Sequence, residues 1–181
     1  MRTQYPTGYT IEPLAEHHRR DEFRCGIVEL DRYFHQQIGQ DKRKKIAAPF
    51  VLIKQNSGEV VGYYTLSATA FPLDELPKAI GSKLPKYPLI PATLIGRLAV
   101  DYQHQGKSLG GYLLMDALYR SMKSEIAAFA VVVDAKAEES SAFYAKYGFI
   151  AFPDHPQHLF LPMKTIEKIF WVQSNNCTPC K

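Results

Sequence analysis

The chain has 181 residues, of which 46% are hydrophobic, 22% charged and 12% aromatic. This apolar content is sufficient for one sizeable core, so a single globular domain is expected. Lysine and arginine number 22 against 18 acidic residues, and the net charge of +4 is too small to identify a partner by itself.

Three further observations limit where the protein works. No run of 18 apolar residues occurs, and the first residues lack a charged segment followed by an apolar one, which excludes a membrane span and an export signal. Three cysteines are too few for a disulfide framework. These features predict a cytoplasmic protein that does not associate with membranes.

The first half of the chain predicts one helix and a hairpin. Residues 27–46 place apolar side chains at helical spacing and end in a run of cations, which is typical of an amphipathic helix. Residues 50–54 and 60–68 are rich in β-forming residues and are separated by a turn-like segment. Residues 71–91 contain five prolines and are expected to form a loop with at most one short helix near 77–84.

The second half predicts alternating strands and helices. We expect strands at residues 93–100, 129–133 and 158–163, and helices from residue 109 onward and over residues 138–147. This alternation predicts an α/β fold of the mixed kind, with helices packed on a mixed sheet. The domain is expected to cover residues 1–170, followed by a flexible tail over residues 171–181.

The segment that joins residues 93–100 to the next helix has the composition of a phosphate-binding loop. A strand that turns into a helix N-terminus directs unpaired backbone N–H groups at one point, where the helix dipole adds partial positive charge. Gly106, Gly110 and Gly111 allow the backbone to approach an anion, and Lys107 adds charge. A plain glycine-containing connection is the alternative interpretation, because such a loop alone is a weak signal.

A second segment, Phe143–Phe149, follows the buried strand at 129–133. Taken alone, Tyr144 is interpreted as a core residue with its hydroxyl satisfied. The order of strand, glycine loop, helix, strand and aromatic helix resembles the GNAT superfamily of N-acetyltransferases. Within it, the chain is similar to the acetyltransferase toxins of bacterial type II toxin-antitoxin pairs, over residues 10–168. The supporting segments are Gln105–Gly111, Phe143–Phe149, Phe23–Gly26, Leu30–Phe34, Val61–Ser67, Leu84–Pro88, Gly96–Asp101 and Val132–Lys136.

The resemblance implies a GNAT fold, in which acetyl-CoA lies where two parallel strands splay apart. The main chain of Leu98 and Val100 would pair with the pantetheine arm, and the amides of residues 105–111 would hold the pyrophosphate. The cofactor-binding residues implied in this way are Leu98, Ala99, Val100, Gln105, Gly106, Lys107, Ser108, Leu109, Gly110, Gly111 and Phe143.

One position departs from the family pattern Q/R-x-x-G-x-G/A. Ser108 stands where the pattern has its middle glycine, while Gln105 and Gly110 match. Serine still supplies its N–H, and its hydroxyl can donate to a phosphate. Cofactor binding is therefore expected to survive unless this position needs a positive φ.

The chemistry implied by the resemblance is direct attack of an amine on the thioester. Tyr144 is the candidate general acid that protonates the departing CoA thiolate, and a main-chain N–H near Val100 would stabilise the oxyanion. An α-amine with a pKa of about 8 is already roughly 10% neutral at pH 7, so no internal base is required.

Charge is concentrated in two segments. Residues 78–123 carry seven cations and two acids, a net of +5, residues 41–45 carry +3, and the remainder is −4. This distribution is consistent with an RNA acceptor stem as partner, although for the second segment taken alone a solvated helix end is the better explanation. The candidate tRNA-binding residues are Arg97, Lys86, Lys83, Lys42 and Arg43.

The toxin resemblance implies that the enzyme acetylates the α-amine of aminoacyl-tRNA and so inhibits translation, that it forms a homodimer, and that a ribbon-helix-helix antitoxin is its partner. The alternatives are a GNAT enzyme for a small amine or a protein N-terminus, and a binding module in which catalysis is secondary. No metal is expected. His155 and His158 are separated by a proline that suggests a turn, and Cys177 and Cys180 lie in the expected tail without the elements that tune redox thiols.

Overall fold

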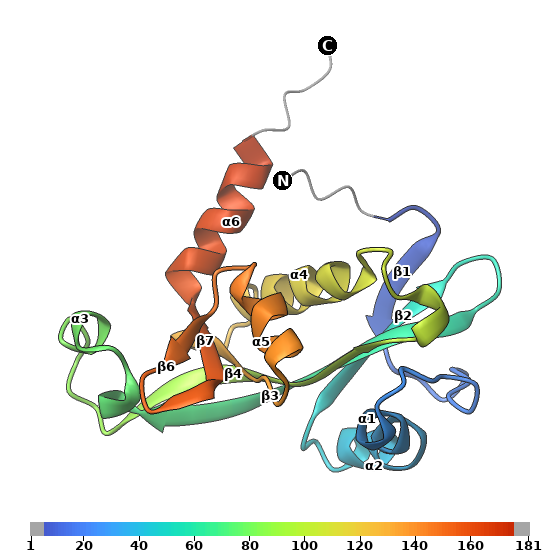
Figure 1. Ribbon diagram of the computed structural model, residues 1–181, viewed down its shortest axis with the longest axis horizontal. Helices are drawn as coiled ribbons and strands as arrows, with labels where there is room; N and C mark the ends of the chain where they lie inside the picture. The colour runs from blue at the N-terminus through green and yellow to red at the C-terminus, as the bar shows by residue number, and fades with distance from the viewer. Residues whose placement is uncertain (1–5, 176–181) are drawn as a thin grey trace. The chain divides into compact units, whose positions relative to one another are not determined.

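The computed structural model describes residues 6–175, with side chains placed through residue 172. The strands of this part form one sheet in the order β1-β2-β3-β4-β5-β7-β6 (Figure 1). Their bounds are Tyr9–Pro13 for β1, Ala48–Lys54 for β2, Glu59–Pro72 for β3, Leu89–Val100 for β4, Ala130–Asp134 for β5, Ile150–Phe152 for β6 and His155–Pro162 for β7. The β4–β5 pair is parallel, which confirms the expected mixed sheet.

The chain divides into two compact units. The first contains the residues up to Ser67 together with Ile95–Ala117, and the second contains Ala68–Leu94 together with the residues from Leu118 onward. Strands β3 and β4 and helix α4 (Leu109–Met122) contribute residues to both. The expected extent of a single domain over residues 1–170 stays a prediction.

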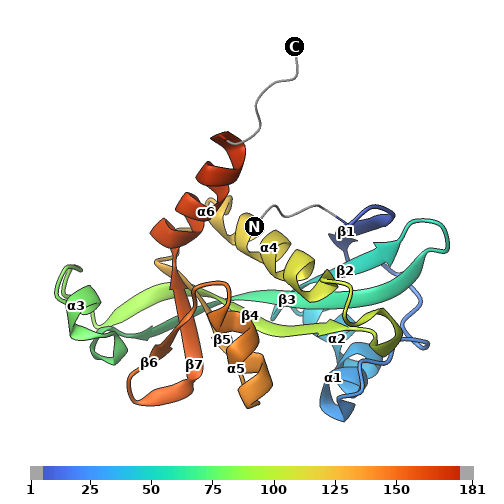
Figure 2. The same ribbon diagram turned by 45° about the horizontal axis from the view of Figure 1, so that its top comes forward.

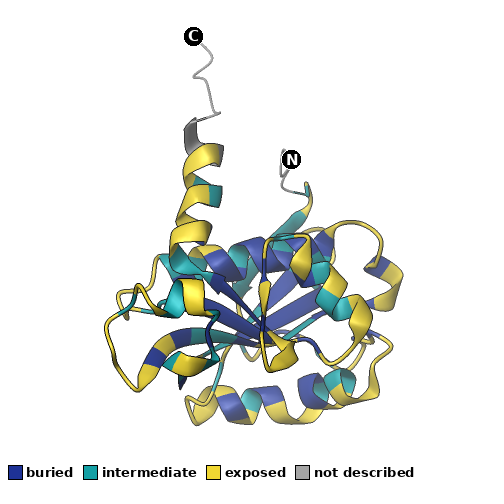
Figure 3. Ribbon diagram, turned by 60° about the vertical axis from the view of Figure 1, so that its left-hand side comes forward, coloured by how far each residue is buried: buried dark blue, intermediate teal, exposed yellow. Residues whose placement is uncertain are grey.

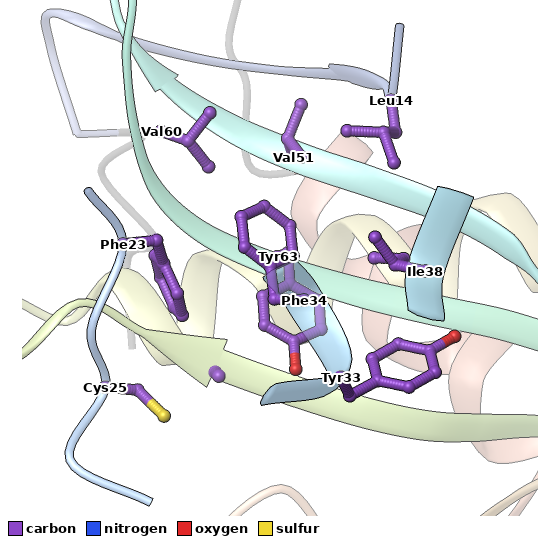
Figure 4. Packing of buried hydrophobic residues seen from close by; sticks show 10 residues of the cluster. Leu14, Phe23, Cys25, Tyr33, Phe34, Ile38, Val51, Val60 and Tyr63 are labelled. Carbon is purple, nitrogen blue, oxygen red and sulfur yellow. The ribbon is translucent and has the colours of Figure 1, made fainter. Parts of the chain in front are cut away.

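In the first unit, a broken helix packs against β2 and β3 (Figure 2). It consists of α1 (Val28–Arg32), a π-helical turn η1 (Tyr33–Gln37) and α2 (Ile38–Arg43), so the helix predicted over residues 27–46 is confirmed with an unforeseen turn inside it. The π-helical turn places Tyr33 and Phe34 in the core, where the Phe34 ring stacks on Tyr63 at 4.4 Å between centroids (Figure 4). Aromatic packing of this kind adds to the burial energy.

Helix α4 begins close to the sheet because of a glycine on β3. A Cβ built on Gly62 would lie 2.9 Å from Cδ1 of Leu113 and 3.1 Å from the carbonyl oxygen of Ala99. Any larger residue would push the helix away, since the Ala99 carbonyl belongs to the backbone of β4 and cannot turn aside. Leu109, Leu113 and Leu114 are buried, so the start of α4 is firmly packed. The loop that precedes it (Figure 2) therefore begins and ends on fixed elements.

The second unit is built on an aromatic core. Phe152 contacts Phe71 and Phe160, with ring centroids 5.1 Å and 4.8 Å away. Its helical elements are the short η2 (Leu73–Glu75) and α3 (Lys78–Gly81), then α5 (Glu138–Ala145) and α6 (Met163–Asn175). The single short helix expected near residues 77–84 is found as α3, with the small turn η2 before it.

Two expectations about the C-terminal region need correction. Helix α6 continues through residues 171–175, which the sequence analysis assigned to a tail; Ile166 and Phe170 supply an apolar spacing that supports the helix. Most of α6 is exposed (Figure 3). His155 and His158 lie in β7 and not in a turn, because Pro156 falls in the exposed half of that strand. Residues 176–181, with Cys177 and Cys180, lie outside the described residues.

Among the residues described, no helix is both long and apolar enough to cross a bilayer.

Candidate active site

The glycine loop after β4 is a cradle of free backbone N–H groups. A short 3-10 turn, η3 (Tyr102–His104), follows β4, and α4 starts at Leu109. Within residues 6–175, the N–H groups of residues 105–111 have no hydrogen-bond acceptor. The next amide along the chain, Tyr112 N–H in the first turn of α4, donates to the Ser108 carbonyl. Free amides at a helix N-terminus form a site for an anion such as a diphosphate.

Two loop residues have left-handed backbone conformations. Gly106 has a φ of 77° and Ser108 a φ of 60°. The position of Ser108 therefore does have the positive φ that the sequence analysis named as the risk to cofactor binding. A left-handed conformation costs a residue with a Cβ roughly 1–2 kcal/mol, so the loop carries strain that a glycine would not.

Asp101 holds the start of the loop in place. Its carboxylate is buried and accepts the Gln103 N–H at 2.9 Å, which fixes the turn η3, and the Arg24 N–H at 3.0 Å. The Tyr102 N–H in turn donates to the Arg24 carbonyl at 2.8 Å. His104 also faces this carboxylate, with Nδ1 3.5 Å from Oδ1. Asp101 thus joins the loop to a segment almost 80 residues earlier in the chain.

Gln105 binds the same segment through its side chain. Its Nε2 donates to the Cys25 carbonyl at 3.0 Å and to the Val100 carbonyl at 3.1 Å. The side-chain amide is therefore engaged with protein carbonyls, whereas the backbone N–H of Gln105 has no acceptor among the described residues. Asp31 completes the connection, since its carboxylate accepts the Cys25 N–H at 2.7 Å.

Cys25 itself is a structural residue. Its side chain is buried, and burial raises the pKa of the thiol to about 12, so the thiol is protonated at neutral pH. It packs in the first-unit core beside Phe23 and Tyr63 (Figure 4). The thiol is thus no candidate for a nucleophile.

The remaining cofactor candidates of the first unit take different positions. Ala99 is buried in the core, whereas Leu98 and Val100 are half-buried on β4. The Lys107 ammonium lies on the Gln103 carbonyl at 3.1 Å and is exposed, so it is free to turn toward an anion. Leu109 is fully buried and Gly110 half-buried at the start of α4.

Tyr144 and Phe143 lie on α5 in the second unit. Tyr144 is 8% exposed, with the rings of Phe143 and Phe149 at 5.1 and 5.3 Å. Burial raises the pKa of the Tyr144 hydroxyl to about 12. In the described part of the chain this hydroxyl has no hydrogen-bond partner, and no side-chain polar atom there is both fully buried and unpaired. The oxygen therefore reaches solvent and can donate to a ligand.

The candidate tRNA-binding residues differ in their surroundings. The Arg97 guanidinium lies over the Tyr33 ring, 3.6 Å from its centroid, which gives Arg97 a packing role as well as a charge. The Lys42 ammonium donates to the Leu14 carbonyl. Arg43 is exposed near Gly39, and Lys83 and Lys86 are exposed near α3 in the second unit. The structure thus brings Arg97, Lys42 and Arg43 into one unit.

One cluster that the sequence analysis passed over has the composition of a metal site. Glu12, His17 and His18 place their ligand atoms within 4.8 Å of one another. However, His18 Nδ1 accepts the Ala15 N–H at 2.8 Å, so its Nε2 carries the proton and donates to Glu12 at 2.9 Å. A metal would need that Nε2 lone pair, and the cluster is therefore a hydrogen-bonded support for β1.

Comparisons with known proteins agree with this geometry. A family model described as an acetyltransferase (GNAT) domain matches residues 89–165. A tRNA-acetylating toxin of Mycobacterium tuberculosis is 33% identical over 144 residues, which are 78% of this chain and 84% of that protein. A probable toxin TacT of Sinorhizobium fredii is 28% identical over 169 residues, which are 88% and 93% of the two chains.

Solved structures show the same likeness. AtaT complexed with acetyl-methionyl-tRNAfMet has a TM-score of 0.83 at 31% identity, over 90% of this chain and 99% of its own. AtaTR bound with acetyl-CoA has a TM-score of 0.78 at 30% identity, over 90% and 98%. The glycine loop and α5 each lie within the matched family region.

Proposed function

Because this chain belongs to the GNAT family of acetyltransferases, in the branch of toxins from toxin-antitoxin systems, we propose that its glycine loop binds acetyl-CoA and that its acceptor is the α-amine of an aminoacyl-tRNA. The observation that carries the proposal is the row of unpartnered N–H groups over residues 105–111 at the start of α4. A diphosphate supplies the acceptor oxygens that these groups need.

The rest of the cofactor follows β4. The main chain of Leu98 and Val100 pairs with the pantetheine arm as an added strand would, which makes recognition depend on backbone geometry. The Ala99 side chain is buried in the core, and the side chains of Leu98 and Val100 on either side of it are half-buried. This end of β4 is therefore packed against the core. Lys107 adds a cation to the phosphates, and Phe143 packs against the cofactor from α5.

In the proposed reaction, the neutral amine attacks the thioester carbonyl and forms a C–N bond, which gives a tetrahedral intermediate; the C–S bond breaks when this intermediate collapses. A main-chain N–H near Val100 stabilises the oxyanion of the tetrahedral intermediate. The departing thiolate, whose conjugate thiol has a pKa of about 8.5, takes a proton from Tyr144. The attacking nitrogen is positively charged in the intermediate, and it loses its extra proton to solvent as the amide forms. Solvent then returns a proton to the tyrosine.

The raised pKa of Tyr144 is consistent with this role. A hydroxyl with a pKa of about 12 is fully protonated at neutral pH, so the acid is present in every enzyme molecule. Transfer to a thiolate of lower intrinsic basicity is uphill in isolation, and the step is driven by collapse of the intermediate and by rapid reprotonation from solvent. The rings of Phe143 and Phe149 pack beside Tyr144, and burial of the tyrosine is the cause of the raised pKa.

The acceptor is inferred from relatives and from charge. A relative at 33% identity is named a tRNA-acetylating toxin, and AtaT is solved with acetyl-methionyl-tRNAfMet. The basic segments of this chain, at residues 41–45 and 78–123, supply the cations that an acceptor stem requires. Arg97, Lys42, Arg43, Lys83 and Lys86 are the proposed contacts.

We further propose a homodimer in the cytoplasm that a ribbon-helix-helix antitoxin controls. AtaT is solved bound to the C-terminus of the antitoxin AtaR, which supports an antitoxin as the partner class. Translation would stop when free toxin acetylates charged tRNA, because an acetylated α-amine cannot attack a peptidyl ester.

The test is incubation of the purified protein with labelled acetyl-CoA and total charged tRNA. We expect label on the amino acid of one or a few aminoacyl-tRNAs. Hydrolysis of the ester should release this label from the tRNA as labelled acetyl-amino acid. Label on a small amine or on protein N-termini, with none on charged tRNA, would instead establish the metabolic or protein-modifying alternative.

A further inference from the structure

Two arginines of the first unit converge on one glycine of α2. A Cβ built on Gly39 would lie 3.3 Å from Nη1 of Arg20 and 3.7 Å from Nη1 of Arg43. The two guanidinium groups therefore share one small area of surface, and the glycine leaves them the space to do so. Arg20 is half-buried and Arg43 is exposed.

Neither guanidinium has a carboxylate partner among the residues that the structure describes. The contact recorded for the Arg20 side chain is with the Phe34 carbonyl, at 3.4 Å from Nη1. Two like charges held together without a counter-ion repel each other, and the repulsion is relieved when an anion binds between them. The pair is thus positioned for an anionic ligand.

Other cations nearby are occupied. The Lys42 ammonium donates to the Leu14 carbonyl, Arg19 forms an ion pair with Glu22, and the Arg97 guanidinium lies on the Tyr33 ring. Arg20 and Arg43 differ from Arg19 and Arg97 because, among the described residues, neither has a carboxylate or a ring as partner, and Arg20 has only the long contact of 3.4 Å to the Phe34 carbonyl. Guanidinium groups are also better suited than ammonium groups to two-point recognition of phosphate.

Side-chain contacts connect the cofactor strand to α2, the helix that carries Arg43. Arg97 of β4 lies on Tyr33 of η1, and the Tyr33 hydroxyl donates to the buried Asp41 of α2 at 3.0 Å. Arg43 follows Asp41 by two residues. A ligand held by the arginine pair is therefore bound to the same unit as the loop over residues 105–111.

We propose that Arg20 and Arg43 together bind one backbone phosphodiester of the tRNA substrate, with Gly39 as the floor of the site. The proposal rests on the proposed function, since it names a contact to the substrate of that enzyme. It also separates Arg43 from Lys42, whose side chain has a structural bond to Leu14.

The test compares Arg20→Ala and Arg43→Ala with Lys44→Ala, which removes the same charge from the next position of the same helix end. Each variant is assayed on aminoacyl-tRNA and on a 3′-aminoacyl-adenosine, which carries the reacting amine without a stem, at ionic strengths of about 50 to 200 mM. Thermal unfolding of each variant shows that it is folded, and Arg43→Lys provides a version that keeps the charge.

We expect each arginine variant to raise the KM for aminoacyl-tRNA by about tenfold or more relative to its effect on the aminoacyl-adenosine. The dependence of log KM on log salt should become shallower by about one unit, as for the loss of one phosphate contact. Lys44→Ala should change the same KM less than about threefold, and Arg43→Lys should recover part of the loss.

Equal effects of Lys44→Ala and the arginine variants would overturn the proposal, because a diffuse field would then explain the binding. A raised KM for acetyl-CoA that is absent with acetyl-dephospho-CoA, which lacks the 3′-phosphate, would overturn it in favour of a cofactor phosphate. Failure of the wild-type enzyme to acetylate either aminoacyl substrate would refute the proposed function itself, which keeps the two results distinct.

Discussion

The glycine loop and helix α5 offer opposite kinds of groups to the proposed ligands. Residues 105–108 are exposed and offer backbone N–H groups, whereas Tyr144 is a buried ring that offers one side-chain oxygen. A site made of amides tolerates a change of side chain and is sensitive to a change of φ. A site made of one hydroxyl has the reverse sensitivity, because the helix backbone around it can stay unchanged while the oxygen is lost.

Removal of that oxygen should have the largest effect. Tyr144→Phe is expected to lower kcat on aminoacyl-tRNA by at least ~100-fold, as the loss of a general acid does. The affinity for acetyl-CoA should stay within about twofold when measured by calorimetry, since the loop is untouched.

Tyr147→Phe is the matched control. It lies on the same aromatic face, with its ring 5.3 Å from Phe143, and we assign it no proton transfer. Its kcat should remain near that of the wild type. Near-normal turnover in Tyr144→Phe would remove Tyr144 from the mechanism.

The pH dependence of turnover tests the state of the same hydroxyl. Between pH 7 and 9 the rate should rise by roughly tenfold, because an α-amine of pKa about 8 becomes neutral. No loss of activity from Tyr144 ionisation should follow below about pH 11, since its pKa is raised to about 12. The pH–rate profile, with each substrate saturating, measures both limbs; a decline with a midpoint near pH 9 would contradict the assignment.

The raised pKa of the Tyr144 hydroxyl also predicts how the free energy of unfolding depends on pH. The unfolded chain ionises this tyrosine at about pH 10, below the folded value of about 12. The contribution of this tyrosine to the free energy of unfolding is therefore fully present below pH 10 and is lost as the pH rises toward 12. Tyr144→Phe should therefore unfold with a smaller dependence on pH over that interval than the wild type.

Asp101→Asn tests the fixed entry into the loop. The Arg24 and Gln103 N–H groups each donate to one carboxylate oxygen of Asp101. Asparagine removes the negative charge and replaces one of these oxygens with an NH₂ group, whose hydrogens would face an N–H donor. We expect the KM for acetyl-CoA to rise about 5- to 10-fold with a smaller change in kcat, in line with a loss of about 1–1.5 kcal/mol. An unchanged KM together with a lower melting temperature would show that Asp101 serves folding alone.

Ser108→Gly should give the smallest effect, in the favourable direction. Relief of the left-handed φ of 60° is expected to stabilise the fold by about 1 kcal/mol or less, after the entropy that glycine adds to the unfolded chain. Urea unfolding measures this change, and the affinity for acetyl-CoA is measured alongside.

Lys45→Gly is the control for backbone strain. Lys45 has a similar φ of 56° but lies at the end of α2, away from the loop. Both variants should gain stability, and only Ser108→Gly should alter acetyl-CoA binding. A loss of binding in Ser108→Gly would show that the serine hydroxyl contacts the phosphates.

Local patterns in the sequence were sufficient for most of the fold. Apolar spacing predicted the helices near 109 and 138 and the strands near 93 and 129, and it placed the glycine loop between two packed elements. The π-helical turn at 33–37 and the strand β1 carry no comparable signal, since each depends on partners far along the chain. The apolar residues of helix α6 do have helical spacing, but the polar residues that follow favoured the interpretation of this region as a tail.

The site was predictable as a set of residue types and not as a set of contacts. The motif identified the loop and Tyr144, but Gln105 and Cys25, 80 residues apart, gave no sign of their hydrogen bond. The same is true of the stacking of Arg97 on Tyr33 and of the convergence of Arg20 with Arg43. Such contacts follow from how the chain returns on itself, which composition and periodicity do not encode.

The two hydrogen bonds of the Gln105 side chain determine which amino acids suit that position. An amide NH₂ has two hydrogens, and both are used here, one on the Val100 carbonyl and one on the Cys25 carbonyl. Arginine also carries paired N–H donors, whereas glutamate has the same shape as glutamine but only acceptor oxygens, which would face two carbonyls. A donor that holds the end of β4 thus accounts for both Gln and Arg in the family pattern, and the main chain of the loop is left for the proposed ligand.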